Sequence, residues 1–363
     1  MSVTVSRPAG PRSTGLAAIL GAVLALAVAA CSTSSGPSGS PGAEPTAAGP
    51  SAAPESTLTV YSGRSEELVG DLFAQFEEAS GIDVQVRYGD TAELAATILE
   101  EGDNSPADVF FGQDAGALGA LQAAGRLAPL PQATLDRVDA AYRSTEGVWV
   151  GTSGRARVLA YNTDRVQEAD LPTSVFDLTD PAWKGRIGWV PTNGSFQSFI
   201  TAMRQLAGEE RTREWLEGML ANEPRVYEGN GAAVEAVASG EVDAALVNHY
   251  YILEAQEEAG ESLPLANHFF ANGDPGSLVN VAGAGIVQGA DHPNAALAFV
   301  DYLLSEAGQQ YFAEAEWEYP LAAGVEPDAR LIPLDEIPRP EIDLADLADL
   351  EGTLRLLQEV GVI

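Results

Sequence analysis

Apolar residues follow two alternating patterns along the chain from residue 58 onwards. The short β-prone run Leu58–Tyr61 is followed by a stretch from Leu68 to Phe76 in which apolar residues recur at helical spacing, and Gly81 is expected to end that helix. Strands and helices that alternate in this way predict a parallel sheet packed by helices, and therefore an α/β fold. Further strands are expected at residues 84–88, 107–111, 157–161, 186–190, 242–247 and 279–287, and further helices at 92–100, 115–124, 196–206 and 295–304.

Residues 321–363 are predicted to form a proline-rich connector and one final helix. In that helix Asp343, Asp346 and Asp349 share one face, while a second face is apolar. The spacing and the glycine of an EF-hand are missing, so a solvated face is favoured over a calcium site. The apolar face consists of Leu344, Leu347, Leu350, Leu354 and Leu357.

Residues 1–30 have the features of an export signal. Arg7 and Arg12 stand in a region without acidic residues, and the apolar run Leu16–Ala30 comes directly after it. That run is too short for a comfortable membrane span, which needs roughly 20 residues. The only cysteine of the chain, Cys31, follows at once.

The junction Val28–Cys31 resembles the lipobox of bacterial lipoproteins, in which the cysteine is acylated. An ordinary signal peptide followed by a chance cysteine is the alternative. Residues 31–56 are rich in Ser, Gly, Pro and Ala and predict a disordered tether. The globular body is therefore expected to be exported and lipid-anchored to the outer face of the cell membrane.

The composition restricts the class of ligand and the number of folding units. The 363 residues include 19 Lys and Arg against 53 Asp and Glu, a formal net charge of −34. A chain this acidic, without a basic run, cannot release counterions from a phosphate backbone, which argues against nucleic-acid binding. The length indicates more than one core, because a single hydrophobic core stops growing at roughly 250–300 residues. A single cysteine excludes an intrachain disulfide.

No catalytic or nucleotide-binding motif passes the test of its sequence context. The glycine-rich pieces at 229–234 and 283–288 lack the third small residue of a dinucleotide-binding loop. No serine stands in a Gly-x-Ser-x-Gly elbow, and nothing singles out a pair of carboxylates for glycoside hydrolysis. We therefore do not expect an enzyme, and an extracellular hydrolase is the minor alternative.

Two adjacent tyrosines, Tyr250 and Tyr251, follow the predicted strand at 242–247. Ligands in open α/β sheets bind at the carboxyl ends of strands, and a loop just past this strand can bring both hydroxyls into one cleft. A phenolate oxygen is a hard anionic ligand that suits Fe(III). Because the free phenol has a pKa of about 10, it ionises at neutral pH only beside such a charge. Two tyrosines that merely pack at the strand end are the alternative.

Segments spread over most of the chain resemble the ferric-ion-binding solute receptors of bacterial ABC importers. The resemblance runs in order from about residue 57 to the end, far beyond a single motif. It is carried by Tyr61–Glu67, Arg87–Ala95, Ala107–Asp114, Trp183–Arg186, Pro191–Phe196, Asn248–Tyr251 and Asp346–Gly361.

The resemblance implies a two-lobed fold of the type II periplasmic-binding-protein class. Each lobe would be a mostly parallel sheet flanked by helices, and the two lobes would close as a hinged clamp on a ligand in the cleft between them. One lobe is expected at residues 57–154 with 281–320 and the other at 155–280, with residues 321–363 packing on both.

The resemblance also implies an iron site and an anion site. Tyr250 and Tyr251 would bind Fe(III) as cargo, with carbonate or phosphate as a synergistic anion. The free N–H groups at a helix N-terminus can hold such an anion, which would neutralise the positive charge that two phenolates leave on the metal. The residues implied for the anion are Asn193, Gly194, Ser195, Asn230 and Asn248.

This chain departs from the family pattern at several positions. Ser65 and Gln113 stand where some members have a histidine and a glutamate, with Glu66 and Asp114 next to them as weaker candidate ligands. Phe196 stands where other members have a third tyrosine. Two arginines are expected to hold the anion from the hinge side instead, namely Arg64 and Arg155.

We therefore predict a monomeric, lipid-anchored receptor that captures Fe(III) with an anion and delivers it to the permease of an ABC iron importer. The alternative is a receptor of the same fold for an organic or anionic solute such as thiamine, a polyamine or a phosphorylated small molecule. The acidic body would steer a cation inward without selecting which one.

Overall fold

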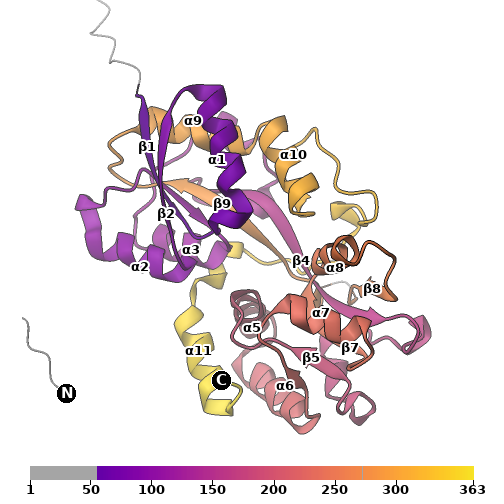
Figure 1. Cartoon of the computed structure of the whole chain (residues 1–363). Helices are drawn as coiled ribbons and strands as arrows, with labels where there is room; N and C mark the ends of the chain where they lie inside the picture. The colour runs from indigo at the N-terminus through magenta and orange to yellow at the C-terminus, as the bar shows by residue number, and fades with distance from the viewer. Residues whose placement is uncertain (1–54, 272) are drawn as a thin grey trace, which may run out of the picture. The chain divides into compact units, whose positions relative to one another are not determined.

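A computed structural model describes residues 55–271 and 273–363, where strands and helices alternate as the hydrophobic pattern predicts (Figure 1). The strands are β1 Thr57–Ser62, β2 Asp83–Tyr88, β3 Val109–Gly112, β4 Val150–Asn162, β5 Ile187–Trp189, β6 Arg225–Val226, β7 Ala244–Asn248, β8 Leu265–His268, β9 Val279–Ile286 and β10 Tyr319–Pro320. The helices are α1 Glu66–Ser80, α2 Thr91–Glu101, α3 Ala115–Ala123, α4 Gln132–Leu135, α5 Gly194–Ala207, α6 Glu209–Ala221, α7 Asn230–Ala238, α8 Tyr251–Ala259, α9 Pro293–Leu303, α10 Glu306–Ala315 and α11 Leu350–Val360, with short 3₁₀ segments between them.

Local sequence accounts for the helices that were predicted. In α1 the residues at helical spacing are buried, including Val69, Leu72 and Phe76, and the opposite face is solvated. Gly81 ends the helix in the left-handed conformation at φ 72°, which glycine adopts without a steric penalty, and its N–H donates to the carbonyl of Glu77. The predicted end of this helix is confirmed.

The strands form one extended sheet in the order β2-β1-β3-β9-β4-β7-β5-β6, while β8 and β10 pair with β4. The outer strands are parallel, β1 with β2 and β3 on one side and β5 with β6 and β7 on the other. The long strands β4 and β9 run antiparallel to their neighbours and connect the two parallel groups. The α/β fold expected from the sequence is confirmed, and the antiparallel pairs come from the strands that cross between the groups.

Strand β4 passes from one hydrophobic core into the others. Val150 and Ala156 belong to a core built around β1, β3 and β9, whereas Leu159 and Val158 belong to two cores around β5 and β7. All of these cores lie in one compact unit of the chain. The lobe boundaries given above stay a prediction.

The C-terminal segment differs from the prediction of one helix with a solvated aspartate face. It consists of a 3₁₀ helix, η8 Leu344–Ala348, and of α11, with a break at Asp349. Asp343 accepts a hydrogen bond from Ala345 N at the start of η8, and Asp349 accepts one from Gly352 N at the start of α11. These two aspartates therefore cap separate helices, and the prediction of a single helix is wrong.

Residues 344–360, which we call the C-terminal strap, contact elements on both sides of the crossing strands. Segment η8 packs on α3. Helix α11 packs on α5 and α6 (Figure 1). Leu347 belongs to the core around β1, whereas Leu356 and Leu357 belong to a core around β5. The Thr201 and Thr353 hydroxyls lie 2.7 Å apart in a buried contact between α5 and α11. The strap therefore connects the two groups of elements by side-chain packing.

The predicted export signal, Cys31 and nearly all of the tether lie outside the described residues. The described part of the chain begins at Glu55, whose carboxylate accepts hydrogen bonds from Asn294 Nδ2 and Ala295 N at the start of α9. Between residues 55 and 363, Asn272 excepted, no helix has the length and apolar character that a membrane crossing requires.

Candidate functional site

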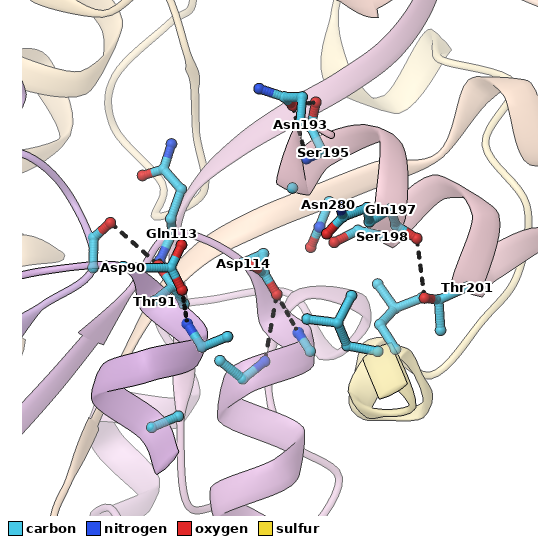
Figure 2. A pocket seen from close by; sticks show the side chains of 18 of the residues that line it. Asp90, Thr91, Gln113, Asp114, Asn193, Ser195, Gln197, Ser198, Thr201 and Asn280 are labelled. Carbon is cyan, nitrogen blue, oxygen red and sulfur yellow. Dashed lines mark hydrogen bonds between the residues drawn. The ribbon is translucent and has the colours of Figure 1, made fainter. Parts of the chain in front are cut away.

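A cavity of about 650 Å³ lies where the crossing strands, α2, α3, α5, the end of β7 and the C-terminal strap meet. Such a volume is in the range of roughly 300–1,000 Å³ that is typical of small-molecule sites. Figure 2 shows polar side chains of α2 and α3 on one wall and those at the start of α5 on another. The predicted site residues that line the cavity are Gln113, Asp114, Arg155, Asn193, Gly194, Ser195, Asn248, Tyr250 and Tyr251.

Both tyrosines of the pair line this cavity, with ring centroids 4.4 Å apart and ring planes at 32°. The sequence pattern predicts a loop for this pair. In the structure Tyr250 is the N-cap of α8 and Tyr251 its first residue, so the turn from β7 into a helix brings the rings together. Burial raises the pKa of Tyr250 well above its ordinary value, and Tyr251 adds to this effect while Arg155 opposes it. In the structure as it stands the Tyr250 phenol is neutral, and an adjacent cation is needed to ionise it.

His249 fixes the backbone between Asn248 and Tyr250. Its Nδ1 accepts a hydrogen bond from Ala156 N at 3.1 Å, so the proton sits on Nε2, which donates to the Trp317 carbonyl at 3.0 Å. Burial lowers the pKa of His249 to about 4, so the ring is neutral at pH 7. The ring therefore connects the end of β7 to β4 and to the segment before β10, and it holds Tyr250 at the cavity.

The residues at the start of α5 line the cavity (Figure 2). The Asn193 side chain caps the helix by accepting hydrogen bonds from Ser195 N at 2.9 Å and from Ser195 Oγ at 2.6 Å. Gly194 is exposed and an added Cβ there would meet no atom within 4 Å, so the approach to the helix start is open. An open helix N-terminus favours an anion through its dipole and its N–H donors.

Arg157 is a site residue that the sequence analysis missed. It lies on β4 directly opposite Asn248 of β7, is 2% exposed and lines the cavity. Its Nη1 donates to Ser195 Oγ at 3.2 Å and its Nη2 to the Leu246 carbonyl at 2.7 Å. Burial lowers its pKa to about 9, so it is still charged at pH 7. The signal that identifies it is the pair Arg155 and Arg157, because alternate residues of a strand face the same side.

Three of the predicted residues do not line the cavity. Arg64 is 1% exposed and pairs instead with Glu318 at 2.9 Å and Glu316 at 3.4 Å. Glu66 is exposed in the first turn of α1. Asn230 is buried at the start of α7, and its side-chain N and O have no hydrogen-bond partner among the described residues. Arg64 is thus a buried ion-pair residue in this structure.

Of the candidate ligands Gln113 and Asp114 at the start of α3, Asp114 is engaged in capping the helix. The Asp114 carboxylate caps α3 by accepting from Gly116 N at 2.9 Å and Ala117 N at 3.4 Å (Figure 2). Its surroundings raise its pKa because burial outweighs the nearby Arg155 charge and these hydrogen bonds. Gln113 Oε1 is buried without a partner in the described chain, and Ser65 is exposed at the N-cap of α1. In residues 55–271 and 273–363 no three His, Cys, Asp or Glu side chains are placed to hold a metal ion together.

Known proteins match this chain over most of its length. The sequence profile of the family described as bacterial extracellular solute-binding protein matches residues 104–335. The chain is 36% identical over 308 residues to the major ferric iron-binding protein of Neisseria meningitidis serogroup B. The match covers 84% of this chain and 93% of that protein.

Two solved structures have the same fold. Iron-bound HitA from Pseudomonas aeruginosa matches with a TM-score of 0.78 and 40% identity, over 84% of this chain and 99% of that one. A Trichodesmium protein in complex with iron and citrate ligands matches with a TM-score of 0.72 and 33% identity, over 84% and 99%. These matches confirm the fold class predicted from the sequence.

Proposed function

Because this chain belongs to the family of bacterial extracellular solute-binding proteins, we propose that it is the ferric-iron receptor of an ABC importer. The names of similar proteins support iron as the cargo, since the Neisseria relative is called a ferric iron-binding protein and HitA was solved with iron. Both descriptions refer to iron binding, and the proposed role needs no enzymatic step. The cargo is held and released without a change of covalent bonds.

The observation that carries the proposal is that Tyr250 and Tyr251 share one cavity with an open helix N-terminus. Two phenolates supply hard, anionic oxygen ligands for Fe(III), and the metal charge in turn lowers the phenol pKa values enough for ionisation near pH 7. His249 holds the tyrosine turn in place, as its hydrogen bonds to Ala156 and Trp317 show. The chain therefore has donors on one side of the cavity that suit the cation.

The anion that accompanies iron would be held at the start of α5. The N–H group of Gly194, with Asn248 and Arg155 also in the cavity wall, suits an anion that completes the iron coordination. Carbonate or phosphate is the simplest such anion.

A larger organic anion is the second candidate, because the cavity of about 650 Å³ far exceeds the room that one metal ion needs. Part of its wall is apolar and comes from the strap, including Leu350 and Leu354. The Trichodesmium protein was solved with iron and citrate, which supports a hydroxycarboxylate as an alternative to carbonate or phosphate.

We further propose that Cys31 carries a lipid and that the receptor works as a monomer next to its permease. This part rests on the sequence alone, namely on the small residues before the only cysteine and on the tether-like residues 31–56. The anchor would keep the receptor within reach of the permease.

A titration with ferric salt in the presence of carbonate, phosphate or citrate tests the iron site. The loaded protein should show a visible phenolate-to-iron charge-transfer band, and iron at a hundredfold excess over its dissociation constant should stabilise the fold by about 2.7 kcal/mol. Tyr251→Phe should shift or remove the band and weaken binding. The matched control is Tyr302→Phe, at a half-buried tyrosine on α9 outside the cavity, which should leave band and affinity unchanged.

The titration also separates the competing cargoes. A protein that gives neither colour nor a thermal shift with any ferric salt is not an iron receptor, and the tyrosine assignment is then wrong. A thermal shift with an organic solute alone would identify a receptor for that solute.

A further inference from the structure

Arg157 is a buried cation without an acidic partner. No carboxylate oxygen lies within 4 Å of it in the described part of the chain, although its side chain is almost fully enclosed. Two of its nitrogens donate to Ser195 Oγ and to the Leu246 carbonyl, both neutral oxygens, and its Nε has no partner. The guanidinium carbon lies 5.7 Å and 5.4 Å from the ring centroids of Phe196 and Phe199.

The other buried arginines near the cavity are compensated within the protein. Arg64 pairs with Glu318 at 2.9 Å, and Arg155 lies 3.9 Å from the same carboxylate and also faces Asp114. Removing an unpaired charge from water is costly, and proteins normally balance it with a partner of opposite sign. Arg157 has no such partner among residues 55–271 and 273–363, so the compensating charge is expected to come from what enters the cavity.

The position of Arg157 shows where that charge would lie. Its Nη1 hydrogen bond ends on Ser195 Oγ in the first turn of α5, next to the exposed Gly194. Residue 157 also faces Asn248 across the β4–β7 pair, two residues before Tyr250. The unpaired guanidinium, the helix N-terminus and the tyrosine pair therefore meet in one wall of the cavity.

We propose that Arg157 selects the anion of the cargo by charge, so that this receptor takes anions with two or more negative charges and rejects monoanions. The proposal rests on the proposed function, because it concerns the anion that accompanies iron. Fe(III) with two phenolates retains one positive charge and Arg157 adds a second, and a dianion neutralises both. Hydrogenphosphate, carbonate and a polycarboxylate such as citrate all satisfy this requirement. Acetate, nitrate and chloride do not.

Anion binding to the iron-free protein, measured by calorimetry, tests the selection without depending on iron. Sulfate and perchlorate are both tetrahedral and differ in charge. In the iron-free protein the Arg157 guanidinium attracts the dianion more strongly than the monoanion, so wild-type protein should bind sulfate more tightly than perchlorate. Arg157→Gln should weaken sulfate binding by about tenfold or more, because it removes a charged donor. Arg157→Lys keeps the charge and should retain most of the affinity. Perchlorate binding as tight as sulfate binding would overturn the proposal.

The unfolding midpoint of the iron-free protein distinguishes this role from a structural one. A guanidinium without an acidic partner contributes little to stability, so Arg157→Gln should unfold at the same urea concentration as wild type or at a higher one. The control is Arg186→Gln, which removes a guanidinium bound to Asp243 and should lower the midpoint without changing sulfate binding. Arg157→Gln that loses stability and keeps its sulfate affinity would show that Arg157 only supports the fold.

Iron loading then separates the two proposals. If no ferric salt gives the charge-transfer band but sulfate binding still depends on Arg157, the iron proposal fails and the anion assignment stands. If iron binds with its band, and acetate supports it as well as phosphate or citrate does, the iron proposal stands and the anion assignment fails.

Discussion

Replacing Gly119 by alanine tests whether the C-terminal strap is held on α3 by close backbone contact. A Cβ at Gly119 would lie 2.5 Å from the Ala345 carbonyl oxygen and 3.0 Å from the Ala345 Cα, both of which belong to the backbone of the strap. The strap would have to move away from α3, because neither atom is the end of a flexible side chain. Its own residues line the cavity, Leu347 and Leu350 among them, so the change reaches the site.

The expected magnitude follows from two opposing effects. Alanine is favoured over glycine in a helix interior by about 0.5–1 kcal/mol. Forcing an extra carbon into a packed contact costs about 1–3 kcal/mol. We therefore expect Gly119→Ala to lower the free energy of unfolding by about 1–2 kcal/mol.

Gly70 in α1 is the matched control. Its added Cβ would meet only Glu66 Cγ at 3.5 Å, an ordinary contact, so Gly70→Ala should raise the free energy of unfolding by about 0.5–1 kcal/mol. Urea unfolding with equal m-values for the variants and wild type measures both. If Gly119→Ala is stabilised as Gly70→Ala is, the strap is not held on α3 as described.

Two further predictions concern an ion pair and the lipid anchor. Burial alone would raise the pKa of Asp243, but hydrogen bonds from Arg186 and Arg165 lower it overall. The ionised Asp243 carboxylate therefore stabilises the fold above the unfolded pKa of about 3.9, and this stabilisation is lost as the pH falls through the lower folded pKa. Asp243→Asn should therefore lower the free energy of unfolding, measured in urea, by about 2–3 kcal/mol at pH 7 and by much less at pH 2 to 3. An equal loss at both pH values would contradict the ion-pair explanation. Cys31→Ala should abolish incorporation of labelled fatty acid in cells, and labelled Cys31→Ala protein would show that the lipid is attached elsewhere.

The parts of the fold that depend on local pattern could be predicted from the sequence. Periodic burial located α1 and its end at Gly81, because a helix face and a glycine cap are set within one segment. The Tyr250–Tyr251 pair was identified for the same reason, since neighbours in sequence stay neighbours in space. Helix α8 was missed, although it is the element that brings the two rings into one cavity.

The parts that depend on distant contacts could not be predicted. Arg64 was expected to hold the anion, but Glu316 and Glu318 approach it from the other end of the chain and pair with it. Arg157 was missed because the spacing of Arg155 and Arg157 puts both on one face of a strand but does not show that this face lines the cavity. The register that sets Arg157 opposite Asn248 decides that, and no local pattern reports a register between residues so far apart. A charge in a sequence does not show whether the fold provides a partner for it.

The charges in the cavity affect how the proposed iron ion and its anion would bind. An iron ion that enters alone leaves uncompensated positive charge next to the buried Arg157, in surroundings where such charge is costly. An anion that enters alone would neutralise the guanidinium but leave the Tyr250 phenol neutral, because burial raises the pKa of Tyr250. If iron and an anion bind as proposed, each ion would improve the site for the other, and linkage requires the factor by which the anion tightens iron to equal the factor by which iron tightens the anion. Release of either one therefore weakens the hold on the other.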